Sequence, residues 1–198
     1  VYNIMLILSS YSLPLAVSKM VAARLAKGQY RNMNRVLRAA LVYATVVGGL
    51  ACFITWNFAG FFATTLFNTP FCVYALRTLA PTIWIMAYLG VFRGYYQGRG
   101  TMVPTALSQV FEQIVNAIVS VAAGSWLFNQ AIKVEILNGE SGSGYSNSWG
   151  AAGGTIGTGA GAFTALVFLL VLFAAYQRTI RKKVRRDRSG SLESYGTI

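Results

Sequence analysis

Long uncharged apolar runs alternate with short polar segments along this chain. A helix that crosses a bilayer needs about 20 predominantly apolar residues. Runs of that length predict about five transmembrane helices, at about 1–23, 39–58, 73–96, 102–128 and 150–176. We therefore expect an all-α, polytopic membrane helix bundle over residues 1–177, followed by a basic cytoplasmic tail or linker over 178–198.

The polar segments predict where the helices are connected. Residues 26–38 form a basic connector, and residues 129–149 form a Gly/Ser-rich loop. The uncharged stretch from 39 to 76 is too short for two spans and a turn, so we expect one span followed by an interfacial segment. The segment 58–70 contains several phenylalanines, as expected at a membrane boundary, and it ends in a turn at 68–70.

The positive charges orient these spans. All but two of the 17 Lys and Arg residues lie in the segments 19–38, 93–100 and 178–188, which five alternating spans place on one side. Cytoplasmic loops carry an excess of Lys and Arg, so this side is predicted to be cytoplasmic. Only Arg77 and Lys133 fall on the other side. The N-terminus then lies outside, and we expect the chain to be a fragment of a longer protein whose preceding helix is missing.

Composition narrows the class of protein. The chain is 55% hydrophobic and 11% charged, whereas soluble domains carry roughly 25% charged residues. Its net charge is +12, and the basic residues cluster between apolar runs. This pattern favours a membrane protein over one that binds nucleic acid. There are no histidines, and no spacing of residues predicts a metal site, a cofactor or a catalytic group, so an enzyme is not expected. Cys52 and Cys72 allow one bridge at most, and we interpret them as unpaired.

Glycines dominate the first half of the last span. Gly153, Gly157 and Gly161 recur at intervals of four, which leaves one helix face bare. The sequence GTGAGA at 157–162 has the form of a dinucleotide fingerprint, but a polar loop precedes it where that fingerprint needs a strand. The pattern predicts close packing against another helix.

A few charged and polar residues near or inside the spans are the candidates for a site. Glu112 is the only acid within a predicted span, and intramembrane ionisable groups are functional candidates by default. It is either a proton or cation site in an aqueous cavity or a structural partner between helices. Gln109, Gln113 and Asn116 share its helix at i, i+3, i+4, i+7 spacing, which predicts one polar stripe that faces protein or water.

Three basic residues lie at the predicted cytoplasmic mouth. Arg93 and Arg99 either bind an anionic headgroup or phosphate, or anchor the helix by the positive-inside rule. Lys19 follows Pro14 and either faces the same cavity or extends to the interface.

Two motifs carry a family resemblance. SLPLAVSK, residues 12–19, and RGYYQGRGTMVPTALSQVFEQIV, residues 93–115, resemble the polysaccharide flippase family, with the stage V sporulation protein B type as the nearest branch. This family belongs to the MATE-like multidrug/oligosaccharidyl-lipid/polysaccharide exporter superfamily. Asn116 stands where a basic residue is common in that family.

The resemblance implies a transporter of two six-helix lobes, of which this chain is part of the N-terminal lobe and lacks the C-terminal lobe. It implies a protein of the bacterial cytoplasmic membrane that flips a lipid-linked saccharide or peptidoglycan precursor by alternating access. Its partners are then membrane lipids, that substrate and the missing lobe, with no nucleic acid. Arg93, Lys19 and Arg99 would attract the pyrophosphate, and Glu112 would line the cavity or pair with an arginine. The alternatives are a cation-coupled multidrug exporter of MATE type and a non-transporting scaffold in cell-envelope or spore assembly.

Overall fold

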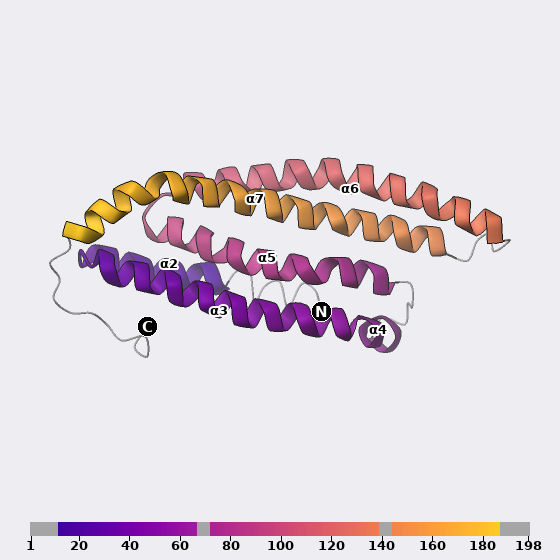
Figure 1. The fold of residues 1–198 in the computed structure, drawn as a ribbon, viewed down its shortest axis with the longest axis horizontal. Coiled ribbons are helices and arrows are strands. Elements are labelled where there is room, and N and C mark those ends of the chain that lie inside the picture. Colours follow the sequence, from indigo (N-terminus) through magenta and orange to yellow (C-terminus); the bar gives the residue numbers. More distant parts are fainter. Residues whose placement is uncertain (1–11, 67–71, 139–143, 187–198) are drawn as a thin grey trace. The chain divides into compact units, whose positions relative to one another are not determined.

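In the computed structural model the described parts of the chain are mostly helical (Figure 1). The structure describes residues 12–66, 72–138 and 144–186. The helices are α2 (Ser12–Ala26), α3 (Tyr30–Asn57), α4 (Ala59–Phe61), a π-helical turn (Phe62–Leu66), α5 (Val73–Gly98), α6 (Val103–Asn138) and α7 (Tyr145–Arg186). Within those described ranges every regular element is a helix, which confirms the all-α fold class.

Four of the helices are long and apolar enough to cross a membrane: Tyr30–Asn57, Val73–Gly98, Val103–Leu137 and Tyr145–Tyr176. They correspond to the second to fifth predicted spans. The first predicted span, 1–23, lies partly outside the described residues, and its described part belongs to α2. The predicted turn at 68–70 also lies outside them.

Glycines in the left-handed conformation end two of the helices. Gly28 has φ 69° and follows α2, and Gly100 has φ 79° and follows α5. Residues with a Cβ adopt this conformation at a cost, so glycine commonly stops a helix there. The Gly28 amide donates to the Leu25 carbonyl oxygen, and the Gly100 amide donates to the Gln97 carbonyl oxygen, both at 2.9 Å. Each helix therefore ends in a hydrogen-bonded turn.

Three segments predicted as connections are more helical than expected. Most of the predicted loop 129–149 is helix, because α6 continues to Asn138 and α7 already begins at Tyr145. The basic connector 26–38 contains the start of α3, and the predicted tail contains the last turns of α7, which reach Arg186. Hydropathy marks where the apolar part of a helix stops, whereas the backbone hydrogen bonds continue into polar sequence until a breaker interrupts them.

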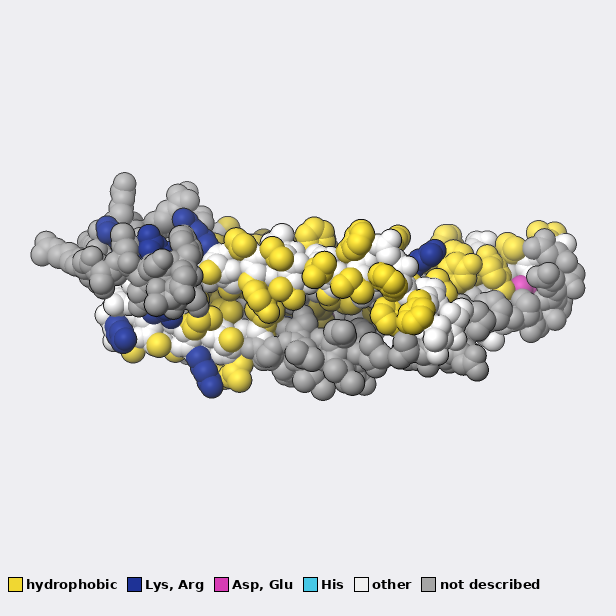
Figure 2. All heavy atoms as spheres, turned by 90° about the horizontal axis from the view of Figure 1, so that it is seen from below, with side chains coloured by type: hydrophobic (Ala, Val, Ile, Leu, Met, Phe, Trp, Pro, Cys, Tyr) yellow, Lys and Arg dark blue, Asp and Glu magenta, His cyan; other side chains and the backbone are white. Residues whose placement is uncertain are grey.

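The chain divides into two compact units. Unit 1 comprises residues 1–48, 86–109 and 165–198, and unit 2 comprises residues 49–85 and 110–164. Each long helix except α2 contributes a part to both units. Figure 2 shows hydrophobic side chains along the visible helix faces, as expected for surfaces that meet lipid, and a gathering of Lys and Arg side chains where α2 ends and α3 begins.

Unit 1 has a core of large side chains. Val17 and Val21 of α2, Met33 and Val36 of α3, and Tyr95 of α5 are almost completely buried in one cluster. A second cluster joins the later part of α5 to α7 through Leu89, Phe92, Tyr96, Ala165 and Leu169. The Tyr96 hydroxyl also donates to the Leu169 carbonyl oxygen at 3.3 Å. Large interlocking side chains therefore hold α2, α3, α5 and α7 together within unit 1.

Unit 2 is packed with small residues instead. Its buried apolar side chains in the described ranges are all alanines: Ala59, Ala63, Ala80, Ala131, Ala152 and Ala162. Cys52 and Cys72, both in this unit, are free cysteines. Small residues allow helix backbones to approach closely, which is how many membrane helices associate.

Candidate functional site

Arg93 lies near the end of α5, in unit 1, and its side chain is half-buried. Its Nε donates to the Ser108 hydroxyl oxygen of α6 at 3.1 Å. The Ser108 hydroxyl in turn donates to the Thr105 carbonyl oxygen at 2.7 Å. Because Ser108 is fully buried, this chain of bonds links α5 to the first turns of α6 inside the unit.

The backbone beside Arg93 is in close contact with α2. A Cβ added at Gly94 would lie 2.5 Å from the Pro14 carbonyl oxygen, and one at Gly98 would lie 2.6 Å from the Ser18 carbonyl oxygen. Only glycine fits at both positions. The Arg93 side chain is thus carried by a stretch of α5 whose position is fixed by α2.

The other two basic candidates lie in different surroundings. Arg99 is half-buried, and its guanidinium carbon is 5.6 Å from the centre of the Tyr95 ring, a cation–π geometry. Lys19 is exposed, whereas its neighbours Val17 and Val21 face the core. The three predicted basic residues are therefore all in unit 1 but do not share one environment.

Glu112 is buried on α6 in unit 2, with only 8% of the residue exposed. Asn116, one turn later, is half-buried, whereas Gln109 and Gln113 are exposed. The predicted polar stripe therefore does not lie in one environment within this chain. Of its four members, Asn116 and the backbone of Glu112 lie against α7.

A polar and glycine-rich seam joins α6 to α7 in unit 2. The Ser120 hydroxyl oxygen is 2.9 Å from both the Asn116 side-chain oxygen and the Gly154 carbonyl oxygen, and its one proton is donated to either. The Thr158 hydroxyl of α7 also donates to the Asn116 side-chain oxygen, at 3.5 Å. Asn116 thus accepts from both helices.

The three glycines at intervals of four lie on the α7 side of this seam. Added Cβ atoms would lie 2.6 Å from the Ala123 carbonyl oxygen at Gly153, 2.5 Å from the Ser120 amide nitrogen at Gly157, and 2.6 Å from the Glu112 carbonyl oxygen at Gly161. The backbone of α7 is therefore in direct contact with the backbone of α6. Glu112 sits at one end of this glycine seam.

Sequence reasoning missed several residues that position the candidates. Thr105, Ser108 and Ser120 are small hydroxyl residues of α6 that are buried or half-buried. Successive members of the series Thr105, Ser108, Glu112, Asn116 and Ser120 are three or four residues apart. Their spacing, read together with that of Glu112, was the signal that would have identified the inner face of α6. The close approach of Gly94 and Gly98 to α2 was likewise visible as a pair of glycines four residues apart.

Comparison with known proteins assigns the family. A sequence profile of the MatE family matches residues 1–122. The chain belongs to the MatE family. The match covers more than half of the chain and includes all the charged and polar candidates, whereas the glycines of α7 lie beyond it. No solved structure matches the chain.

Two relatives from Bacillus subtilis (strain 168) give the relationship more detail. Stage V sporulation protein B is 30% identical over 187 residues, which is 94% of this chain and 33% of that protein. Lipid II flippase MurJ is 32% identical over 130 residues, which is 62% of this chain and 24% of that protein. The chain thus spans about a third and about a quarter of the length of these relatives. The relationship and the four apolar helices make it a multi-pass bacterial membrane protein.

The two units carry different kinds of chemistry. In unit 1, half-buried guanidinium groups can bind a phosphate through charge-assisted hydrogen bonds. In unit 2, a buried carboxylate can bind or release a proton or cation in a segment that crosses the membrane. Among the residues that the structure describes, no three acidic, Cys or His side chains lie close enough to hold a metal ion.

Proposed function

We propose that this chain forms part of a transporter that moves a lipid-linked saccharide or peptidoglycan precursor across the membrane by alternating access. The observation that supports the proposal is its 30% identity, over 94% of its length, to stage V sporulation protein B, together with its similarity to a lipid II flippase. Alternating access needs two bundles that move around a central site. The remaining partner would be a second lobe of the same protein.

In this proposal the guanidinium group of Arg93 attracts the pyrophosphate of the lipid-linked substrate. Support comes from its half-buried position on a membrane-spanning helix and from the fixed backbone of Gly94 and Gly98 beside it. Arg99 and Lys19 contribute long-range attraction at the cytoplasmic mouth. Surrounding membrane lipids are the other partners, and the protein forms no covalent intermediate with its substrate and needs no cofactor.

One observation favours a second function. Glu112 is a buried acid on a membrane-crossing helix of a MatE-family chain. A cation-coupled drug exporter needs such a group, because a carboxylate that exchanges a proton or Na⁺ can link ion movement to a conformational change. In that case the ion gradient, rather than the lipid headgroup, would be sensed by this part of the protein.

The test is transport by the full-length protein that contains this segment, reconstituted in vesicles with a fluorescent lipid II probe. We expect Arg93→Ala to lower the initial rate about tenfold, the equivalent of losing one charge-assisted hydrogen bond. Ser108→Ala is the matched control, because it removes the Arg93–Ser108 bond and keeps the positive charge. If both variants lost the same fraction of the initial transport rate, Arg93 would have a structural role, and its proposed role in substrate binding would be overturned.

Glu112→Gln separates the alternatives. If the wild type does not move lipid II but expels cationic dyes in an ion-dependent way that Glu112→Gln abolishes, the exporter replaces the flippase. If neither substrate moves while the protein is still required for envelope assembly, the scaffold replaces both. Gln113→Ala, an exposed neighbour on the same helix, controls for changes in α6 itself.

A further inference from the structure

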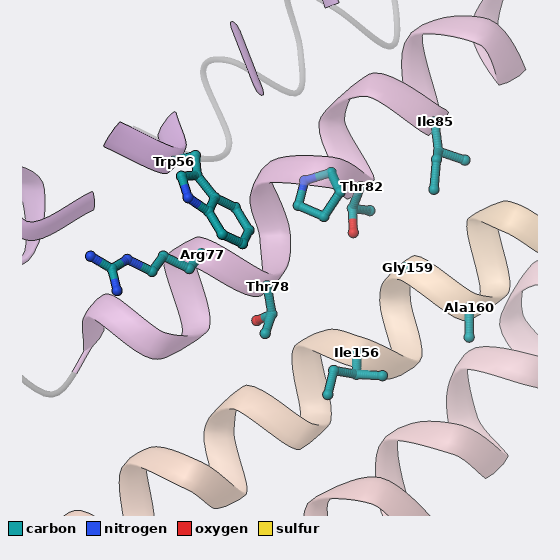
Figure 3. Close-up of a pocket in the computed structure, with 9 residues that line it drawn as sticks. Trp56, Arg77, Thr78, Thr82, Ile85, Ile156, Gly159 and Ala160 are labelled. Atoms are coloured by element: carbon teal, nitrogen blue, oxygen red, sulfur yellow. The ribbon is translucent and has the colours of Figure 1, made fainter. Parts of the chain in front are cut away.

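Unit 2 contains a groove that neither the proposed transport site nor the predicted residues include. It has a volume of about 390 Å³ and is lined by Trp56 from α3, by Arg77, Thr78, Pro81, Thr82 and Ile85 from α5, and by Ile156, Gly159 and Ala160 from α7. That volume lies within the roughly 300–1,000 Å³ typical of small-molecule sites. Figure 3 shows Arg77 at one end of the groove, with Ile85 and Ala160 toward the other end.

The two ends of the groove differ in polarity. Arg77 to Ile85 covers about 12 Å along α5, at 1.5 Å per residue. The Arg77 end carries an exposed guanidinium group, and Pro81 removes the amide that would bond the Arg77 carbonyl oxygen within the helix. The rest of the lining is largely apolar, with Trp56, Ile85 and Ile156 as its large side chains.

The Thr78 hydroxyl of the groove is already engaged along the α5–α7 contact. Thr78 donates to the Ala75 carbonyl oxygen at 2.9 Å, and its hydroxyl also pairs with that of Thr155. A Cβ at Gly159 would lie 2.9 Å from the Thr82 hydroxyl oxygen, so α5 and α7 are in close contact there. A molecule in the groove therefore meets one charged end and an apolar wall.

We propose that this groove binds one molecule of an anionic phospholipid from the surrounding bilayer, with its phosphate on Arg77 and an acyl chain against Trp56, Ile85 and Ile156. Charge complementarity supports this occupant, because Arg77 and Lys133 are the two cations that the charge pattern predicts on the side opposite the basic loops. Trp56 is 51% exposed and Ile156 is 40% exposed within the chain. An apolar groove between membrane-crossing helices fills with acyl chains, and the arginine selects lipids that present a phosphate with net negative charge.

The proposal predicts a lipid preference that depends on Arg77. The protein is purified in detergent and titrated with phosphatidylglycerol or phosphatidylcholine, and bound lipids are counted by native mass spectrometry. We expect the wild type to retain phosphatidylglycerol about tenfold more tightly than phosphatidylcholine, in line with one charge-assisted hydrogen bond. Arg77→Gln should abolish that preference, and Ile156→Trp, which fills the groove, should lower the retention of both lipids.

Lys133→Gln is the matched control, because Lys133 is exposed on the same predicted side and does not line the groove. Equal losses in Arg77→Gln and Lys133→Gln would show a general charge effect and overturn the proposal. Retention by Ile156→Trp equal to that of the wild type would place the lipid elsewhere and overturn it too. Stronger Arg77-dependent binding of undecaprenyl phosphate than of phosphatidylglycerol would assign the groove to a carrier lipid instead. An absence of lipid preference in the wild type would overturn the proposal.

Discussion

The two units of this chain are packed in opposite ways. The largest fully buried side chains, among them Tyr95, Met33, Leu89 and Leu169, all lie in unit 1, whereas the buried apolar residues described in unit 2 are alanines. Lipid tails are as apolar as a leucine side chain, so helix association in a membrane gains little from moving apolar groups out of the solvent. Helix association then depends on the number of close van der Waals contacts between the helices. Large interlocking side chains and closely approaching backbones both provide such contacts.

The difference predicts opposite sensitivities. Unit 1 should be destabilised most when a buried side chain is shortened, because the large side chains around it cannot move in to fill the cavity. Unit 2 should be destabilised most when a side-chain atom is added at a helix contact, because its helices already touch along their backbones. Measurements of the free energy of unfolding in detergent, by denaturant titration, test both statements.

The largest effect is expected in unit 1, from Leu169→Ala. Leu169 is completely buried against α5, and truncating such a residue costs about 3 kcal/mol in lost contacts and a residual cavity. Leu170, the next residue, is 42% exposed, and we expect Leu170→Ala to cost about 0.5 kcal/mol. Similar costs for the two variants would mean that unit 1 does not have the interlocked core described above.

A smaller effect is expected from an addition in unit 2. Gly157→Ala places a methyl group 2.5 Å from the Ser120 amide nitrogen, so α6 and α7 must separate, at a cost of about 2 kcal/mol. Gly154 lies on the same helix with nothing within 4 Å of an added Cβ. Gly154→Ala should therefore stabilise by about 0.5 kcal/mol, because alanine loses less backbone entropy in a helix. If both variants changed the free energy of unfolding in the same direction, the close backbone contact at the glycine seam would be contradicted.

The smallest effect is expected from the polar contacts of that seam. Ser120→Ala removes the hydroxyl shared by Asn116 and the Gly154 carbonyl oxygen, and interhelical hydrogen bonds in membranes average about 0.6 kcal/mol. Thr164→Ala is the comparison, since the Thr164 hydroxyl donates back to Ala160 in its own helix. Its unfolding free energy should change by less. A loss from Ser120→Ala as large as that from Gly157→Ala would show that hydrogen bonds, rather than close contact, hold α6 to α7.

Sequence patterning predicted the helical fold and the apolar segment of each described span, because the length of an uncharged run directly reflects bilayer thickness. It placed the end of α5 at 96 where the helix ends at Gly98, but it stopped the fourth span at 128 where α6 continues to Asn138. The first end is marked by Gly100, whose left-handed conformation stops the helix. In the second, the residues after 128 include good helix formers, and no breaker interrupts the backbone bonds.

The candidate site was only partly predictable. An acid within an apolar run is conspicuous, so Glu112 stands out as a candidate, whereas Ser108 and Ser120 look ordinary until the register of α6 against α5 and α7 is known. Gln109 and Gln113 fitted a helical stripe in sequence but are exposed in the structure. Periodicity identifies which residues share a helix face, but only the position of the neighbouring helix decides which face is buried.

The connection between α6 and α7 includes a side-chain hydrogen bond. The Glu135 carboxylate, buried near the end of α6, accepts a hydrogen bond from the Ser146 amide in the first turn of α7 at 3.1 Å. A carboxylate at a helix N-terminus satisfies an amide that has no partner within the helix and matches the positive end of the helix dipole. The two helices are therefore joined by this bond as well as by the covalent chain between them. Neither partner of this bond lies in the sequence from 139 to 143, so we expect substitutions there to leave it intact and Glu135→Ala to remove it.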